Sequence, residues 1–419
     1  MRLYTLLLHL LLPFVVLRLY WRSLRAPDYR RRLAERFGFF RGRPPPGGIW
    51  VHAVSVGEVQ AIEPLVRHLR ERHPERVVIL TTSTPTGSAR VRALFGDEVF
   101  HVYFPYDLPW CVDAFLERVR PRLLVMVETE IWPNLLRLCA KRGIPTLLAN
   151  GRLSARSARG YARLGDFTRR VFGLIGRVAA QSPADAERFV ALGVPAERVA
   201  VTGSIKFDQR LLASVQEQVQ VVKRIWGEDR PVWVAASTHE GEEEQVLEAH
   251  AHILERVPSA LLVLVPRHPE RFDRVAALVK RRGFGLVRRS EGAPCGPETR
   301  VFLGDTMGEL PLFLGVADVA FIGGSLVKRG GHNMLEAAAQ GVPVVFGPHV
   351  FNFSAIAALL VEREAAVQVR DARELAGVVG RWLGDASERS RIGENGRRAV
   401  EENRGALERL IALVEQQLP

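Results

Sequence analysis

From residue 49 onward the chain alternates short apolar runs with helical stretches, and this alternation restricts the fold more than any other feature. The run IWVHAVSV precedes the helical stretch VQAIEPLVRHLRERH, and a second apolar run, RVVILTTST, follows it. Such βαβ alternation predicts parallel strands with helices packed on both faces of a doubly wound sheet. The further strands expected in this half are 99–104, 123–127, 146–149, 178–180 and 199–202.

A second series of strands begins with VWVAAST at Val232, after a charged helical stretch from 208 to 229. Its further expected strands are 261–265, 286–288, 301–303, 319–322 and 342–346. A length of 419 residues suits two domains better than one. We therefore expect an α/β protein with two Rossmann-like domains, 22–218 and 219–419. Whether the last helix packs back on the first domain stays open.

The N-terminus carries an apolar run from Leu3 to Leu17, interrupted only by Thr5, His9 and Pro13. Spanning a bilayer takes about 20 residues, so by length a cleaved signal, an interfacial helix or a minimal span would all fit. No small-x-small cleavage site follows, and the positive charge lies behind the run instead of before it. We interpret residues 1–21 as a membrane-anchor segment, with an amphipathic packing helix as the alternative.

The net charge of +12 is concentrated near this segment. The first 45 residues hold ten arginines against Asp28 and Glu35, which leaves about +4 for the remaining chain. That remainder is too small for a broad nucleic-acid face, and anionic membrane lipids are the expected partner of the arginines. The positive-inside rule then places the body on the cytoplasmic side of the membrane. The three cysteines are too scattered for a metal site or a disulfide framework.

Glu58 follows the first expected strand in the sequence Ser55-Val56-Gly57-Glu58. The helix dipole alone favours a carboxylate in a first helical turn. Ligands of open α/β sheets, however, bind beyond the carboxyl ends of the strands, where Glu58 is a natural general base. Gly57 would permit the close approach of another molecule. The residues themselves leave both roles for Glu58 open.

Three more strand ends of the first half carry polar residues. The turn 81–88 is rich in hydroxyls and glycine, and it suits either an anion or helix capping. Glu128 and Glu130 crowd the stretch 128–134, and burying both without a partner would be costly. This favours a cleft position that binds hydroxyls or a proton, with exposure to solvent as the alternative. Lys206 follows the last strand, where an anionic substrate group or a salt bridge with Asp208 would each account for it.

In the second half, strand-to-helix turns are expected at 266–272, 304–309 and 323–325. The stretch 330–336 places Gly330 and Gly331 before a helix with Glu336 in its first turn. Backbone amides there would hold a phosphate while the carboxylate holds ribose hydroxyls. The sequence lacks the GxGxxG, Walker and GxSxG motifs, zinc-ligand spacing and an Asp-x-Asp pair. We expect a nucleotide site without a metal or another cofactor.

Taken in order, these motifs resemble the bacterial Kdo (3-deoxy-D-manno-octulosonic acid) transferases, and the resemblance covers essentially the whole chain. The matching motifs are SVGE, TTSTPTGS, VETEIWPN, NGRLSARS, TGSIKFD, ASTHEGEE, VPRHPERF, GDTMGEL and GGSLVKRGGHN. The resemblance implies a GT-B glycosyltransferase whose two Rossmann-like domains face each other across a cleft. The first would bind the acceptor and the second the donor, CMP-Kdo.

The resemblance also implies the reaction: transfer of Kdo from CMP-Kdo to the lipid A precursor, lipid IVA, in lipopolysaccharide core biosynthesis. It implies Glu58 as the general base, with Glu128 and Lys206 as transition-state stabilisers. Met334 replaces the proline expected between Asn333 and Leu335, which would loosen the phosphate turn. The CMP contacts that the resemblance implies are Pro266, Arg267, Met307, Gly308, Glu309, Asn333, Met334, Leu335 and Glu336.

Two other classes of function remain as alternatives. A nucleotide-sugar epimerase or hydrolase would share the nucleotide turn, but it would not need the apolar N-terminus. A non-catalytic protein that binds membranes or nucleic acid is supported only by the net charge and the N-terminal segment, and it would leave the clustered carboxylates without a purpose.

Overall fold

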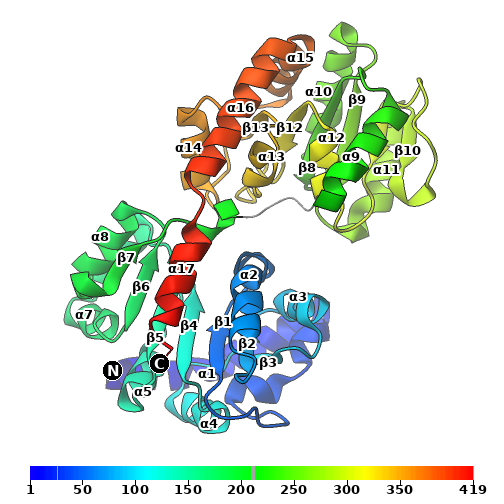
Figure 1. The fold of residues 1–419 in the computed structure, drawn as a ribbon. Coiled ribbons are helices and arrows are strands. Elements are labelled where there is room, and N and C mark those ends of the chain that lie inside the picture. Colours follow the sequence, from blue (N-terminus) through cyan, green and yellow to red (C-terminus); the bar gives the residue numbers. More distant parts are fainter. Residues whose placement is uncertain (26, 209–212, 419) are drawn as a thin grey trace. The chain divides into compact units, whose positions relative to one another are not determined.

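The computed structural model describes residues 1–25, 27–208 and 213–418, and it divides into two compact units. Unit 1 comprises Met1–Asp208 and Arg404–Pro419, and unit 2 comprises Gln209–Asn403. Each unit is built on a seven-stranded parallel sheet with helices on its faces (Figure 1). This confirms the prediction of two doubly wound α/β domains.

The sheet of unit 1 has the strand order β3-β2-β1-β4-β5-β6-β7. The order reverses between β1 and β4, and ligands of such sheets bind beyond the strand ends at that switch point. Its strands are β1 (Ile49–His52), β2 (Val78–Thr82), β3 (Phe100–Tyr103), β4 (Leu123–Val127), β5 (Thr146–Gly151), β6 (Arg177–Ala180) and β7 (Val199–Val201).

The helices of unit 1 cover both faces of this sheet. They are α1 (Arg2–Arg25), α2 (Val56–Arg72), α3 (Pro85–Phe95), α4 (Pro109–Val119), α5 (Pro133–Lys141), α6 (Ala155–Ala162), α7 (Asp166–Phe172), α8 (Pro183–Ala191) and α17 (Ala406–Glu415), with the 3₁₀ turns η1 (Pro27–Arg30), η2 (Leu33–Phe37), η3 (Ala196–Arg198) and η4 (Ile205–Asp208).

Both faces of β1 are buried, as a parallel strand requires. Ile49 and Val51 belong to one apolar core of unit 1, whereas Trp50 belongs to the other. Successive side chains of a strand point to opposite faces, so the short run IWV anchors two helical layers at once.

Unit 2 repeats the plan with the order β10-β11-β9-β8-β12-β13-β14 and a switch point between β8 and β12. Its strands are β8 (Val232–Thr238), β9 (Leu261–Pro266), β10 (Leu286–Arg288), β11 (Val301–Leu303), β12 (Val319–Ile322), β13 (Val344–Phe346) and β14 (Ala366–Gln368). Its helices are α9 (Ala213–Trp226), α10 (Glu243–Arg256), α11 (Phe272–Arg281), α12 (Leu310–Val316), α13 (Leu335–Ala339), α14 (Ser354–Glu362), α15 (Ala372–Gly384) and α16 (Ala386–Glu402), with the 3₁₀ turns η5 (Pro269–Arg271) and η6 (Arg289–Glu291).

The structure differs from the sequence-based organisation in three places. The boundary expected between 218 and 219 falls inside α9, which belongs wholly to unit 2, and residues 209–212 of the expected helix lie outside the described part. The edge strand β14 was not predicted, because three residues carry too little periodicity. No helix directly follows β12, since turns occupy the chain before α13.

The C-terminal helix α17 lies against the sheet of unit 1 (Figure 1), and Leu410 and Val414 are buried in that core. The Asp208 carboxylate accepts hydrogen bonds from the backbone amides of Gly405 (2.6 Å) and Leu407 (2.7 Å) at the start of this helix. It satisfies amides that the helix itself leaves unpaired. Asp208 therefore has a structural task.

Candidate active site

Glu58 lies in the first turn of α2, directly beyond the carboxyl end of β1. Its Oε2 accepts a hydrogen bond from the Val54 amide (2.7 Å), and its Oε1 accepts one from the Ser55 hydroxyl (2.8 Å). Ser55 is the N-cap of α2, so the pair forms a variant of the capping box. The capping role is thus real, and it fixes the position of the carboxylate.

The same carboxyl group has an unusual protonation equilibrium. Burial, with a smaller contribution from the nearby negative charges of Glu128 and Glu130, raises the pKa of Glu58 to about 7. The hydrogen bonds from Val54 and Ser55 oppose this shift. A carboxylate whose pKa lies near neutrality can take up a proton at physiological pH, as a general base must.

Glu128 and Lys206 form an ion pair beyond the ends of β4 and β7. The Lys206 ammonium nitrogen lies 2.8 Å from Oε1 of Glu128, and both side chains are largely shielded from solvent. The alternative expectation paired Lys206 with Asp208, whose carboxylate caps α17. Glu128 also has a φ of 63°. Non-glycine residues adopt this left-handed conformation rarely, and such strain concentrates at functional sites.

The strand β4 ends at Val127, directly before Glu128. The Glu130 carboxylate accepts a hydrogen bond from the Trp132 indole (2.6 Å), and its Oε2 lies 3.6 Å from Nε2 of His52. Glu58, Glu128 and Glu130 remain close enough for their charges to interact. Unit 1 thus gathers three carboxylates and one ammonium group beside its switch point.

His52 is a further residue of this cluster that the sequence analysis missed. It is the last residue of β1, fully buried, and its ring stacks on Phe104 at a centroid distance of 3.8 Å. Its Nδ1 lies 3.0 Å from the Thr81 hydroxyl, whereas its Nε2 has no hydrogen-bond partner. A histidine at the end of an otherwise apolar strand was the available signal.

The hydroxyl-rich turn 81–88 mainly has structural tasks. Thr84 caps α3 and accepts a hydrogen bond from the Gly87 amide (3.0 Å). Ser88 contacts His101 and Arg32, and Thr81 accepts a hydrogen bond from Trp50. Capping and packing therefore account for these residues without an anion.

In unit 2, seven of the nine residues expected to hold CMP occupy two neighbouring turns or the starts of the helices that follow, one before α12 and one before α13, whereas Pro266 ends β9 and Arg267 follows it. Asn333 donates a hydrogen bond to Oε1 of Glu336 (3.0 Å) and accepts one from the Leu335 amide (3.2 Å). Burial raises the pKa of Glu336, and the positive charge of Arg267 opposes that shift. Met334, at the proline position, is fully buried.

The turn before α12 places Glu309 at the N-cap position of that helix. The Arg289 guanidinium forms a salt bridge with Glu309 (2.7 Å) and lowers its pKa. Met307 is exposed, and Gly308 has a φ of 87°, which glycine adopts without strain. Since α12 contacts α13, the two turns lie in one region of unit 2.

In the glycine-rich turn after β12, a side chain of the protein occupies the backbone amides. The fully buried Glu242 carboxylate accepts hydrogen bonds from the amides of Gly324 (2.7 Å), Ser325 (3.1 Å) and Leu326 (2.9 Å). These amides are therefore engaged within unit 2. Close to this turn, the rings of His239 and His332 stack with their Nε2 atoms 2.9 Å apart.

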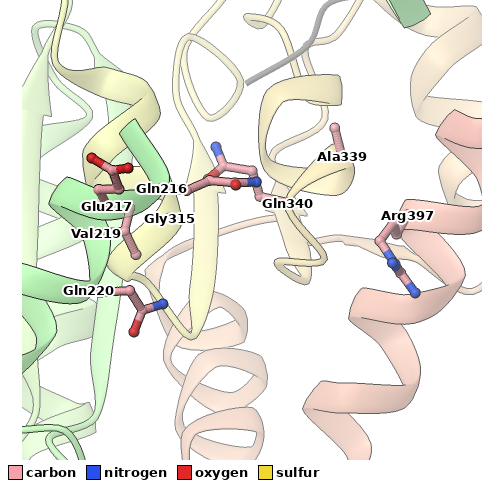
Figure 2. Close-up of a pocket in the computed structure, with 8 residues that line it drawn as sticks. All are labelled: Gln216, Glu217, Val219, Gln220, Gly315, Ala339, Gln340 and Arg397. Carbon is pink, nitrogen blue, oxygen red and sulfur yellow. The ribbon is translucent and has the colours of Figure 1, made fainter. Parts of the chain in front are cut away.

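A cavity of about 570 Å³ lies elsewhere in unit 2, between α9, α12, α13 and α16 (Figure 2). None of the predicted site residues lines it. Its lining residues are Gln216, Glu217, Val219, Gln220, Gly315, Ala339, Gln340 and Arg397. Within the described residues, no group of three or more His, Cys, Asp or Glu side chains has a geometry that could hold a metal ion.

Comparison with solved structures shows the architecture. The UDP-GlcNAc 2-epimerase from Neisseria meningitidis bound to UDP-GlcNAc superposes with a TM-score of 0.58, over 88% of this chain and 99% of that one. The sequence identity is 12%. The likeness therefore shows a shared two-domain fold and not a shared activity.

Comparison of sequences shows the family. A family model described as 3-deoxy-D-manno-octulosonic-acid transferase (kdotransferase) matches residues 31–209. The 3-deoxy-D-manno-octulosonic acid transferase of Haemophilus influenzae is 44% identical over 99% of this chain and 98% of its own length. That of Bordetella pertussis is 38% identical over 99% of both. Similarity at this level over the full length means that the chain belongs to the 3-deoxy-D-manno-octulosonic-acid transferase family of glycosyltransferases.

Proposed function

We propose that the chain transfers Kdo from CMP-Kdo to the lipid A precursor, lipid IVA, with Glu58 as the general base. The observation that carries the proposal is the Glu58 carboxyl group, fixed by two hydrogen bonds and with its pKa raised to about 7. Glu58 takes the proton of the acceptor hydroxyl while the oxygen of that hydroxyl bonds to the anomeric carbon of Kdo. The bond from that carbon to the CMP phosphate breaks, and CMP leaves with the electron pair.

Lys206 stabilises the negative charge of this reaction. The leaving CMP gains charge on its phosphate, and the donor carries a carboxylate next to the reacting carbon. An ammonium group held in place stabilises such charge without having to reorganise. The ion pair with Glu128 supplies the fixed position, since its 2.8 Å contact restrains a side chain that otherwise has many rotamers. In this proposal Glu128 is a positioning residue.

Unit 2 binds the CMP moiety. The buried carboxyl group of Glu336 accepts from Asn333 and leaves acceptor capacity for ribose hydroxyls. Arg267 places positive charge beside Glu336, as a nucleotide phosphate would require. Pro266, Met307, Gly308, Glu309, Met334 and Leu335 complete the proposed CMP site. No metal is required in this proposal, because arginine and lysine side chains supply the positive charge.

Membrane attachment brings the enzyme to its lipid-borne acceptor. The helix α1 is long and apolar enough to enter a membrane, and its apolar side chains are exposed. We propose that the enzyme works at the inner membrane, with its body on the cytoplasmic side, where arginines meet anionic lipids.

The test is incubation of the purified protein with CMP-Kdo and lipid IVA, following the mass of the glycolipid and the release of CMP. We expect the mass of one or more Kdo residues to be added. The Glu58→Gln variant is the matched control for the chemistry. CMP release without a change in the glycolipid would show hydrolysis instead of transfer, and an intact donor would refute the assignment of the substrates.

A further inference from the structure

The helix α1 presents an apolar surface that the protein does not cover. Within Arg2–Leu24, none of the residues in the most apolar stretch of 18 is buried inside the protein. Apolar residues are exposed around most of the helix, which is typical of a segment that a membrane covers. The most exposed are Leu3, Leu6, Leu10, Phe14, Leu17, Trp21 and Leu24.

The first turn of α1 is nevertheless bound to the body of unit 1. The Tyr4 hydroxyl donates to Oδ2 of Asp107 (2.9 Å), and the Thr5 hydroxyl donates to Oδ1 of Asn134 (3.0 Å). Both acceptors are buried. The Tyr4 ring also packs on Phe167 of α7 at a centroid distance of 5.8 Å. Figure 1 shows the N-terminus beside α5 and α7.

The other end of α1 returns to the same unit within a few residues. Ser23 is buried and accepts a hydrogen bond from Arg30 (2.5 Å) of η1. Arg32 then donates to the Ser88 hydroxyl (3.0 Å) and to the His101 carbonyl (2.9 Å) in the body of unit 1. Both ends of the helix are therefore attached to one folded unit.

These attachments decide the orientation of α1 relative to a bilayer. A helix of 24 residues is about 36 Å long, and the hydrocarbon core of a bilayer is about 30 Å thick. A spanning α1 would carry Tyr4 to the side of the membrane opposite to Arg32. Asp107 and Asn134 belong to the folded body, which cannot be on both sides, so a spanning helix would have to lose both hydrogen bonds at its first turn.

We infer that α1 does not span the membrane but lies along the surface of one leaflet, with its exposed apolar side chains inserted among the lipids. This inference rests on the membrane attachment in the proposed function and is independent of the sugar chemistry. A helix in this position is inserted by about 5–10 Å below the head groups along its whole length.

The charges next to α1 fit an anionic lipid surface. In the α6–α7 segment, Arg156, Arg159 and Arg163 are exposed and recur at a spacing that places them on one helix face. Arg169 and Arg170 follow in α7, and Asp166 is the only acidic residue between 155 and 170. Phe167 connects this segment to Tyr4. The basic face therefore begins where the first turn of α1 docks.

The test measures insertion depth at three positions of the full-length protein in phosphatidylcholine vesicles containing phosphatidylglycerol. The variants Leu3→Cys, Leu10→Cys and Leu17→Cys, each with a fluorescent label, probe one side of the helix, because a spacing of seven residues is close to two full turns. Quenching by brominated lipids reports the depth of each label. Cys295→Ser provides the background, since Cys111 and Cys139 are buried.

Similar, shallow depths at all three positions would support the inference. A label at Leu10 near the bilayer centre, with the other two near opposite surfaces, would overturn it. If the protein does not float with vesicles at all, both the inference and the proposed membrane attachment are refuted, while Kdo transfer to detergent-dispersed acceptor would still test the chemistry separately.

A second measurement tests the basic face. Arg159→Ala and Arg163→Ala should each weaken binding to anionic vesicles about fivefold, the equivalent of about 1 kcal/mol per arginine, and leave binding to neutral vesicles unchanged. Arg281→Ala, at an exposed position of α11 in unit 2, is the matched control. Equal binding by all three variants would refute the role of the α6–α7 segment.

Discussion

The pH dependence of transfer is the sharpest test of Glu58 as the general base. With a pKa of about 7, one carboxyl group in eleven is ionised at pH 6 and about ten in eleven at pH 8, so kcat/KM should rise about tenfold between these values. An unshifted glutamate, with a pKa of 4.5, would give an almost flat profile over this range. The measurement is the initial rate of transfer at subsaturating concentrations of substrate, which reports kcat/KM, across pH 5 to 9.

The Glu58→Gln variant separates the chemistry from the capping role. Its amide oxygen retains one acceptor for Val54 or Ser55, but it cannot take up the proton, and we expect kcat to fall by about 10²- to 10⁴-fold. CMP affinity should stay unchanged, because the proposed CMP residues belong to unit 2. Normal turnover in this variant, or a parent profile that is flat from pH 6 to 8, would refute the reasoning.

The pH dependence of the protein's stability tests the raised pKa of Glu58 independently of activity. The folded protein holds the Glu58 proton more tightly than the unfolded chain, so this group lowers the free energy of unfolding as the pH rises from about 4.5 to about 7. The shift corresponds to about 3 kcal/mol. Glu58→Gln removes this titration, and we expect the variant to gain stability relative to the parent protein between pH 5 and pH 8. Urea denaturation at both pH values measures the difference.

Three further predictions concern the remaining site. Glu128→Gln and Lys206→Met should each lower kcat strongly. The double variant should lose little more kcat than Lys206→Met alone, because Glu128 acts through the lysine, and additive losses would contradict a positioning role. Glu336→Ala should weaken CMP binding, measured by calorimetry, about tenfold or more while kcat at saturating donor changes less, and unchanged affinity would remove Glu336 from the CMP site. EDTA should leave transfer intact, and strong inhibition that Mg²⁺ or Mn²⁺ reverses would reveal a required cation.

The alternation of apolar runs was enough to predict two doubly wound sheets. Both faces of a strand in such a sheet are buried, so its residues are apolar wherever the strand lies in the sheet. The short edge strand β14 was not predicted, since three residues are too few to show the periodicity of a strand. The position of Glu58 in a first helical turn could likewise be predicted, because Ser55 and Glu58 form a local capping pattern that depends on four consecutive residues.

The pairing of groups that lie far apart along the chain could not be predicted from such local patterns. Lys206 had a nearby acidic residue, Asp208, yet it pairs with Glu128, 78 residues earlier, because Asp208 caps the returning helix α17. The buried Glu242 binds the amide of Gly324, 82 residues further along the chain. In both cases the tertiary fold brought together groups that no local pattern connects.

The sequence thus settled the strand-to-helix pattern, the family and the local positions of the reactive carboxyl groups, because these depend on short-range periodicity and on ordered motifs. The tertiary structure decided which charges meet, how far burial moves the pKa of Glu58, and that the first turn of α1 binds Asp107 and Asn134. These properties depend on desolvation and on distances between segments that only the packed chain brings together.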